Sequence, residues 1–297
     1  MGAALVGIAP LKAISNTSSK PLKLTILHTN DMHSHIEAFS SGRNKGLGGM
    51  FQLSSLVKKI RQEEDNILLL DAGDIFQGTP YFNLFGGELE FRLMSEMGYD
   101  AVTIGNHDFD NGIEGLSKQM HHANFPFISS NYDFRQTVLE DKVLPHKIFD
   151  KGGIKIGVIG IGIELRGLVD SKLYGNTTYL DPVSIANKKA QYLKKKENCD
   201  IVICLSHLGF KYKSEKISDI KLAEQSKNID LIIGGHTHSF LNEPVVVKNS
   251  VKKDVLISQV GFGAIKLGKI DFYFDGNNSN SLTFARPYES ESLDVSA

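Results

Sequence analysis

Short apolar runs alternate along the chain with segments in which apolar side chains recur every three or four positions. The runs are rich in Ile, Val and Leu and lack strict alternation of apolar and polar residues, as expected of strands that are covered on both faces. We therefore predict buried strands at residues 22–27, 66–70, 101–104, 126–129, 154–163, 200–206, 230–234 and 255–258.

Two segments between these runs have the periodicity of amphipathic helices, residues 48–64 and residues 181–197. The second follows Asp181-Pro182, which is a helix start signal. The predicted buried stripes are Met50, Leu53, Val57 and Ile60 in the first segment, and Val183, Ile185, Ala186, Ala190 and Leu193 in the second. The alternation of strands and helices predicts a layered α/β fold.

Polar side chains begin where several apolar runs end. LTIL is followed by HTNDMHSH, LLL by DAGD, AVTI by GNHD, VICLS by HLG, and LIIG by GHTH. In open α/β sheets, functional sites assemble beyond the carboxyl ends of the strands. We therefore expect these strand ends to converge on one site.

The side chains at these strand ends are of types that bind metal ions. They are Asp31, His33, Asp74, Asn106, His207, His236 and His238. Each of them alone has an ordinary explanation, such as a turn or a hydrogen-bonded core histidine, but burying all of them together is costly unless a cation satisfies them. The set is too large for one tetrahedral zinc and contains no thiolate, so it favours two metal ions.

A two-metal site suits the hydrolysis of phosphate esters. Asp74 is the candidate bridging ligand; one site would take Asp31, His33 and one histidine of GHTH, and the other would take Asn106, His207 and the second histidine. Two ions about 3.5 to 4 Å apart generate a bridging hydroxide and hold phosphoryl oxygens for in-line attack. Mixed oxygen and nitrogen ligands permit Mn, Zn, Fe or Co.

These residues carry a family resemblance. The blocks Asp31-x-His33, Gly73-Asp74, Gly105-Asn106-His107-Asp108, His207 and Gly235-His236-x-His238 resemble the signature of the calcineurin-like metallophosphoesterases. LHTNDMHSH, DAGDIFQGTP, GNHDFDNG, FPFISSNYD and IIGGHTHS further resemble the catalytic, N-terminal domain of the 5'-nucleotidase and UDP-sugar hydrolase family. The resemblance implies a four-layer α-β-β-α sandwich, in which two mixed sheets are flanked by helices.

The resemblance also implies roles for GNHDFD. Asn106 would bind a metal and the substrate, while His107 would contact the substrate phosphate and either stabilise developing charge or protonate the leaving oxygen. Asp110 would orient and charge His107. We expect Asp108 to support the loop or orient a ligand, and His35, like His28, to support or pack against the ligands.

The implied function is a dinuclear-metal phosphomonoesterase of the 5'-nucleotidase type that acts on a phosphorylated small molecule, most simply a nucleotide. The alternatives are a 2',3'-cyclic-nucleotide phosphodiesterase and a sugar-nucleotide pyrophosphatase. A non-catalytic binding subunit is a weaker alternative, because the chain retains every expected ligand together with His107.

The N-terminal residues 1–21 are apolar and then polar, which indicates a truncated export signal, and hence a periplasmic or secreted protein, or else a disordered tail. We expect residues 22–297 to form a single catalytic domain. Because full-length relatives carry a C-terminal substrate domain, we expect that domain to be absent here or supplied by a separate polypeptide, and selectivity for the leaving group to be weak.

The composition argues against some partners and some structural features. The chain of 297 residues has 33 Lys and Arg against 34 Asp and Glu, which does not favour a nucleic-acid partner. It has no apolar run of the roughly 18 residues that span a bilayer. Cys199 and Cys204 are five positions apart, so we expect them on opposite faces of a strand without a disulfide.

Overall fold

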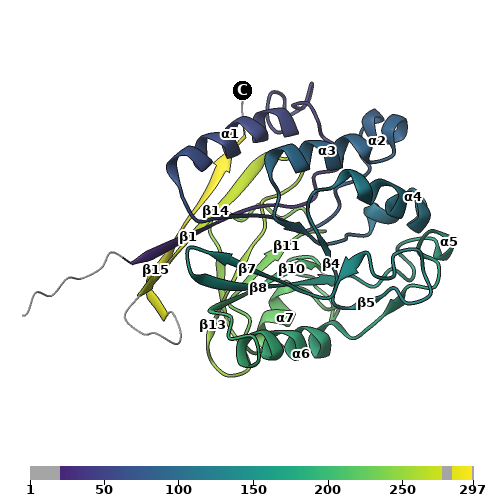
Figure 1. Cartoon of the computed structure of the whole chain (residues 1–297). Coiled ribbons are helices and arrows are strands. Elements are labelled where there is room, and N and C mark those ends of the chain that lie inside the picture. The colour runs from purple at the N-terminus through teal and green to yellow at the C-terminus, as the bar shows by residue number, and fades with distance from the viewer. Residues whose placement is uncertain (1–20, 276–282, 296–297) are drawn as a thin grey trace, which may run out of the picture.

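The computed structural model describes residues 21–275 and 283–295, and two mixed β-sheets lie at its centre (Figure 1). Within the described residues, the first sheet has the strand order β15-β14-β1-β2-β3-β4-β6. Its strands are β1 (Leu22–Thr29), β2 (Ile67–Asp71), β3 (Ala101–Val102), β4 (Phe127–Ile128), β6 (Val143–Leu144), β14 (Lys266–Asp275) and β15 (Thr283–Asp294). From β1 to β6 neighbouring strands are parallel, while β14 is antiparallel to both β1 and β15.

The second sheet has the strand order β12-β13-β11-β10-β8-β7. Its strands are β7 (Lys147–Lys151), β8 (Ile154–Gly162), β10 (Ile201–His207), β11 (Leu231–Gly234), β12 (Val245–Lys248) and β13 (Asp254–Ser258). Strands β8, β10, β11 and β13 are parallel, and the two edge strands are antiparallel to their neighbours. A small separate sheet pairs β5 (Tyr132–Asp133) with β9 (Thr178–Tyr179).

Helices cover the outer faces of the two main sheets, so the predicted four-layer α-β-β-α sandwich is confirmed (Figure 1). The first sheet is covered by α1 (Met50–Glu63), α2 (Pro80–Phe85), α3 (Glu88–Met97) and α4 (Gly112–Gln119). The second is covered by α6 (Pro182–Lys195) and α7 (Asp219–Gln225), and the short α5 (Ser171–Tyr174) contacts α4. No helix of the described residues has the length and apolar character that a bilayer span requires.

Successive side chains of each central strand enter different apolar layers. In β2, Leu68 and Leu70 belong to the layer between the sheets, whereas Ile67 and Leu69 pack in the layer beneath α1 and α3. Ile203 of β10 joins the central layer from the second sheet. Because both faces of these strands are covered, the sequence reads as an almost continuous apolar run.

Both predicted helices are confirmed. Helix α1 buries the four residues of the predicted stripe. Helix α6 begins at Pro182, and the Asp181 side chain accepts the Ser184 backbone N–H at 2.7 Å, so a polar cap and a proline fix its start. Of its predicted stripe, Ala186, Ala190 and Leu193 are buried, and Val183 and Ile185 pack partly buried against the same layer.

The prediction for the cysteines was wrong about their faces. Cys199 and Cys204 are both buried in the layer beneath α6, and they are not joined by a disulfide. The reason is that β10 begins only at Ile201, so Cys199 lies in the preceding turn, where its N–H is donated to the Leu193 carbonyl at 2.9 Å. Of the predicted N-terminal export signal or tail (residues 1–21), residues 1–20 lie outside the described residues.

The layer between the sheets should carry a large share of the stability. We expect Ile203→Ala, which removes a fully buried side chain from this layer, to lower the free energy of unfolding by about 2–5 kcal/mol, since it leaves a cavity between two packed sheets. Urea unfolding of the chelator-treated protein measures this. Val251→Ala, at an exposed position, should change it by less than about 0.5 kcal/mol, and equal effects would contradict the prediction.

Candidate metal centre

The loops that follow β1 and β2 run side by side at the carboxyl ends of these strands. The backbone N–H of Asp31 is donated to the Gly73 carbonyl at 2.9 Å, and that of His33 to the Asp74 carbonyl at 3.0 Å. The strands are parallel neighbours, so their ends reach the same edge of the sheet. Asp31, His33 and Asp74 are thereby brought together although they are far apart in sequence.

Two glycines allow the strand ends to approach more closely than any other residue would. A Cβ at Gly105 would lie 2.2 Å from Asp74 Oδ1, and a Cβ at Gly235 would lie 2.8 Å from His207 Nδ1. Contacts this short do not occur for real side chains, so both positions require glycine. The glycines preceding Asn106 and His236 in the sequence blocks therefore have a steric role.

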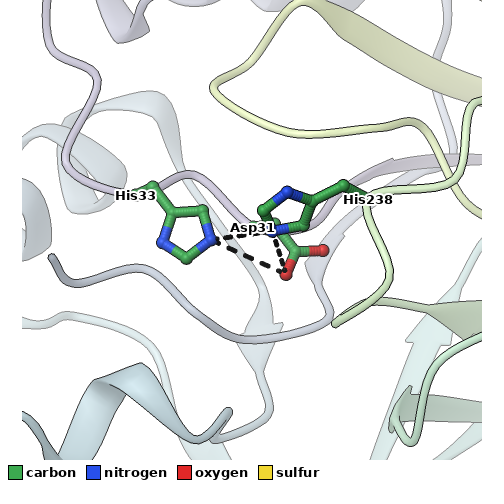
Figure 2. Close-up of side chains that lie close together, drawn as sticks. All are labelled: Asp31, His33 and His238. Atoms are coloured by element: carbon green, nitrogen blue, oxygen red, sulfur yellow. Dashed lines mark hydrogen bonds and ion pairs between the residues drawn. The ribbon is translucent and has the colours of Figure 1, made fainter. Parts of the chain in front are cut away.

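One group of candidate ligands consists of Asp31, His33 and His238, whose ligand atoms point toward one another (Figure 2). His33 Nε2 lies 2.9 Å from His238 Nε2, and Asp31 Oδ1 lies 3.4 Å from His238 Nε2 and 3.9 Å from His33 Nε2. Two ligand atoms, each about 2.1 Å from one ion and at right angles, would be about 3 Å apart. The spacing fits a shared cation.

The second group consists of Asp74, His207 and His236. His207 Nε2 lies 3.0 Å from Asp74 Oδ2, and His236 Nδ1 lies 2.7 Å from the side-chain oxygen of Asn106. Asn106 thus lies beside the second group of candidate ligands. The two histidines of the GHTH turn belong to different groups, as predicted.

The histidine rings are oriented by backbone carbonyls. Nδ1 of His33 lies 3.2 Å from the Phe76 carbonyl, and Nδ1 of His207 lies 2.7 Å from that of Ala72. A carbonyl only accepts, so Nδ1 carries a proton in both rings, and Nε2 is the nitrogen that faces the candidate metal position. His207 Nε2 is buried and makes no hydrogen bond, because its approach to Asp74 is close but not aligned for one. A cation would satisfy this buried nitrogen.

The electrostatics of the groups also favour cations. Burial alone would lower the pKa of His207, but the charges of Asp74 and Asp31 raise it to about 10, so positive charge is strongly preferred at this position. Burial would raise the pKa of Asp74, but His207 holds it below its ordinary value, so Asp74 is ionised. Burial lowers the pKa of His33, and burial with the neighbouring His207 lowers that of His236 to about 4, which keeps both imidazoles neutral as ligands must be.

Several candidate ligands have strained backbones. A positive φ is found at Asp31 (51°), His33 (49°), Asp74 (57°), His236 (72°) and His238 (50°). Left-handed conformations are unfavourable for residues other than glycine and persist where the surrounding contacts over-determine them, commonly at functional sites. Five of the seven candidate ligands therefore lie in strained loop positions, a feature they share with other residues such as Gln77 and Ala264.

His107 and Asp110 form the pair that the family resemblance implies. His107 Nδ1 lies 2.8 Å from Asp110 Oδ2, and the backbone N–H of His107 is donated to Asp74 Oδ1 at 2.7 Å. The hydrogen bond to Asp110 raises the pKa of His107 against the effect of burial. The His107 ring lies 5.4 Å from that of His33, so a partly exposed imidazole stands at the edge of the first group.

Asp108 is a buried support for the loops that carry Asp74 and Asn106. One carboxylate oxygen accepts the backbone N–H groups of Ile75 and Phe76 at 2.9 and 3.1 Å, and the other accepts those of Asp74 and Gly105 at 3.1 and 2.8 Å. These contacts agree with the loop-supporting role that the sequence suggested.

The expected supporting histidines pack beside the site. His35 stacks on Phe39 with ring centroids 4.3 Å apart, and its Nδ1 lies 3.3 Å from the Met32 carbonyl. His28 is fully buried, with its Nε2 3.0 Å from Ser258 Oγ. All seven predicted ligands lie together, but their binding of metal, the bridging role of Asp74 and the role of His35 remain predictions.

Sequence reasoning missed two polar side chains that hold the ligands. Asn30 donates from Nδ2 to Asp31 Oδ2 at 2.6 Å, and Gln259 donates from Nε2 to the Gly235 carbonyl at 2.5 Å. Asn30 stands within the HTNDMHSH block, and Gln259 directly follows the predicted strand at 255–258. Both residues follow predicted strands, and this position is the sequence feature that could have indicated their role beside the site.

The sequence profile of the calcineurin-like phosphoesterases matches residues 24–240, and the chain belongs to this family. Its members are metal-dependent phosphoester hydrolases that use two divalent metals, and the two groups of side chains match that requirement.

Individual relatives are 5'-nucleotidases. The chain is 38% identical over 266 residues to a 5'-nucleotidase of Vibrio cholerae, covering 85% of this chain and 46% of that protein. It is 32% identical to a snake venom 5'-nucleotidase of Gloydius brevicauda, covering 91% and 48%. The crystal structure of a 5'-nucleotidase precursor from Thermus thermophilus matches with a TM-score of 0.82 and 30% identity, covering 93% and 55%. The chain thus spans about half the length of these relatives.

Replacing the Asp108 carboxylate should loosen the loops beneath the metal ligands. In Asp108→Asn, one of the two carboxylate oxygens becomes an NH₂ group. Each oxygen position faces two backbone N–H donors, so the NH₂ group meets two donors in either orientation of the amide. We therefore expect the free energy of unfolding to fall by about 2–3 kcal/mol. Urea unfolding in chelator measures this. Asp150→Asn is the control, because Asp150 is exposed and one remaining oxygen can still accept its single Gly153 N–H; a comparable loss in both variants would refute the prediction.

Proposed function

We propose that this chain hydrolyses phosphate monoesters of nucleotides with two divalent metal ions, as a 5'-nucleotidase does. The observation that carries the proposal is the pair of ligand groups beside the His107 and Asp110 pair. Two ions held by these groups would supply an activated water and positive charge for the phosphoryl oxygens. The Vibrio cholerae relative supports the nucleotide as substrate.

The protein's own residues divide the remaining work. Asp31, His33 and His238 would hold one ion, and Asp74, Asn106, His207 and His236 the other, with Asp74 also reaching the first. His107 would bind the phosphate and donate its proton to the leaving oxygen, and Asp110 would orient the ring and keep it protonated. Asn106 would contribute its amide to the substrate phosphate as well as its oxygen to the ion.

The setting of the protein is a further part of the proposal. A relative named as a snake venom protein supports secretion, and the composition of the N-terminal segment supports export to a periplasm or beyond. We also propose that residues 22–297 act as one catalytic domain, and that a substrate domain, where one is used, is supplied by another part or polypeptide.

A substrate panel with controlled metal tests the activity. After treatment with chelator, the chain should lose hydrolysis of mononucleotides and regain it with added Mn²⁺ or Zn²⁺, because the ions held by the two ligand groups would supply the activated water and the charge on the phosphoryl oxygens. Mononucleotides, UDP-glucose, 2',3'-cyclic nucleotides and an aryl phosphate should be compared by phosphate release. Exclusive cleavage of cyclic nucleotides or UDP-glucose would favour the corresponding alternative, and no hydrolysis of any substrate with metal present would refute the proposal.

The role of His107 can be tested separately. We expect His107→Ala to keep the wild-type metal content, since its side chain is in neither ligand group, and to lower kcat for a mononucleotide by about 10²- to 10⁴-fold because proton donation is lost. Elemental analysis and steady-state kinetics measure the two quantities. His121→Ala, at an exposed histidine that contacts only the Lys118 carbonyl among its described hydrogen bonds, should match wild type. Unchanged turnover in His107→Ala would exclude the acid role.

A further inference from the structure

Gln259 is buried at the carboxyl end of β13, at the same edge of the sheet as the metal ligands. It is not among the candidate ligands, and its side chain is completely shielded from solvent. A buried amide needs partners for both its oxygen and its nitrogen, and these partners identify what it holds.

The Gln259 amide spans the turn that carries His236 and His238. Its Nε2 donates to the Gly235 carbonyl at 2.5 Å, and its Oε1 accepts the Ser239 backbone N–H at 2.5 Å and the Thr237 hydroxyl at 3.0 Å. The contacts fall before, between and after the two histidines. One side chain therefore ties the whole turn to β13.

The same contacts connect the turn to the loop after β10. Thr237 Oγ1, which donates to Gln259, accepts the Phe210 backbone N–H at 2.9 Å, and Phe210 lies three positions beyond the ligand His207. A Cβ at Gly234 would lie 3.2 Å from Gln259 Nε2, so the amide also packs against the end of β11. Gln259 is thus surrounded by the elements that carry three candidate ligands.

The turn requires such support because both histidines have a positive φ, 72° at His236 and 50° at His238. In a free loop, these residues would favour other backbone conformations. His236 belongs to the second ligand group and His238 to the first. A relaxation of the turn would therefore move one ligand of each ion.

The residues that follow Gln259 hold Asp31 in the same way. The Val260 N–H is donated to Asn30 Oδ1 at 2.9 Å, and Asn30 Nδ2 donates to the Gly261 carbonyl at 2.6 Å as well as to Asp31. Phe262 stacks on the His238 ring with centroids 5.0 Å apart. The connection from β13 to β14 thus contacts the first ligand group at both Asp31 and His238.

We propose that Gln259 is a positioning residue for the dinuclear centre: its amide fixes the histidine turn so that His236 and His238 each reach a different ion. The inference rests on the metal centre of the proposed function. It adds that affinity for both ions depends on an uncharged side chain that touches neither of them. Partners that orient metal ligands typically contribute 10- to 100-fold to metal affinity.

Binding of Mn²⁺ alone to the chelator-stripped full chain tests this proposal without substrate. Gln259→Met keeps the approximate volume and removes all three hydrogen bonds, so calorimetric titration should show both dissociation constants raised by about 10- to 100-fold. At saturating Mn²⁺, kcat should return close to wild type, since the ligands themselves are present. Thr237→Val, which removes one of the three contacts, should raise both constants less, and its effect should be reduced when combined with Gln259→Met.

Asn249→Leu is the matched control. Asn249 is also a buried amide, and its oxygen accepts the N–H groups of Val251 and Lys253 at 3.0 Å each, but it lies in the turn that precedes β13, at the opposite end of the strand. It should lower thermal stability and leave Mn²⁺ affinity unchanged. Wild-type Mn²⁺ affinity in Gln259→Met would overturn the proposal. If that variant does not fold, unchanged affinity in Thr237→Val overturns it instead. The binding test uses no substrate, so it decides this proposal even if the protein proves to have no phosphatase activity.

Discussion

Nitrogen and oxygen atoms that can bind a cation face one another at the carboxyl ends of the strands, and the site depends on the positive charge placed between them. His33 and His238 bring their Nε2 atoms to 2.9 Å, and His207 Nε2 lies 3.0 Å from a carboxylate oxygen of Asp74 without an aligned hydrogen bond. Such close contacts require positive charge between the atoms, which a shared proton or a metal ion supplies. A pair of divalent cations supplies that charge, which is why the ligand groups and the metal requirement of the family agree.

The fold can hold these atoms together because the free-energy cost of the strained loops is shared between the packed strands and the buried hydrogen bonds. Strained residues such as Asp74 and His236 lie two or three positions after the ends of strands that are packed on both faces, so the strands cannot move to relieve the strain. Buried acceptors then collect the N–H groups that the irregular loops leave free, as Asp108 does with four of them. The rigid layers and the polar supports together maintain an arrangement that neither would maintain alone.

The sequence was sufficient for the layers and the candidate ligands because both depend on local signals. Continuous apolar runs showed strands covered on both faces, and a ligand-type residue after a run showed the active edge of the sheet. It was not sufficient for Cys199, because an alternation argument cannot tell where a strand begins. Nor could it show the supporting role of Gln259, whose partner Gly235 is distant in sequence. The rule that found the ligands would also have found Gln259, since it follows the strand at 255–258, but an amide on its own does not indicate a metal.

Each ligand group has two buried members and one partly exposed histidine, His238 in the first group and His236 in the second, so both groups can be reached from the same open side. The side chains of His207 and Asp74 are 0% and 2% exposed, whereas those of His238 and His107 are both 39% exposed. Under the proposed function, a phosphate ester would therefore arrive on the side of His238 and His107. His107, held by Asp110 on this open side, would then be placed to give a proton to the leaving oxygen. The buried members of both groups, Asp31 and His33 in the first and Asp74 and His207 in the second, would keep the ions in fixed positions while substrates exchange on the open side.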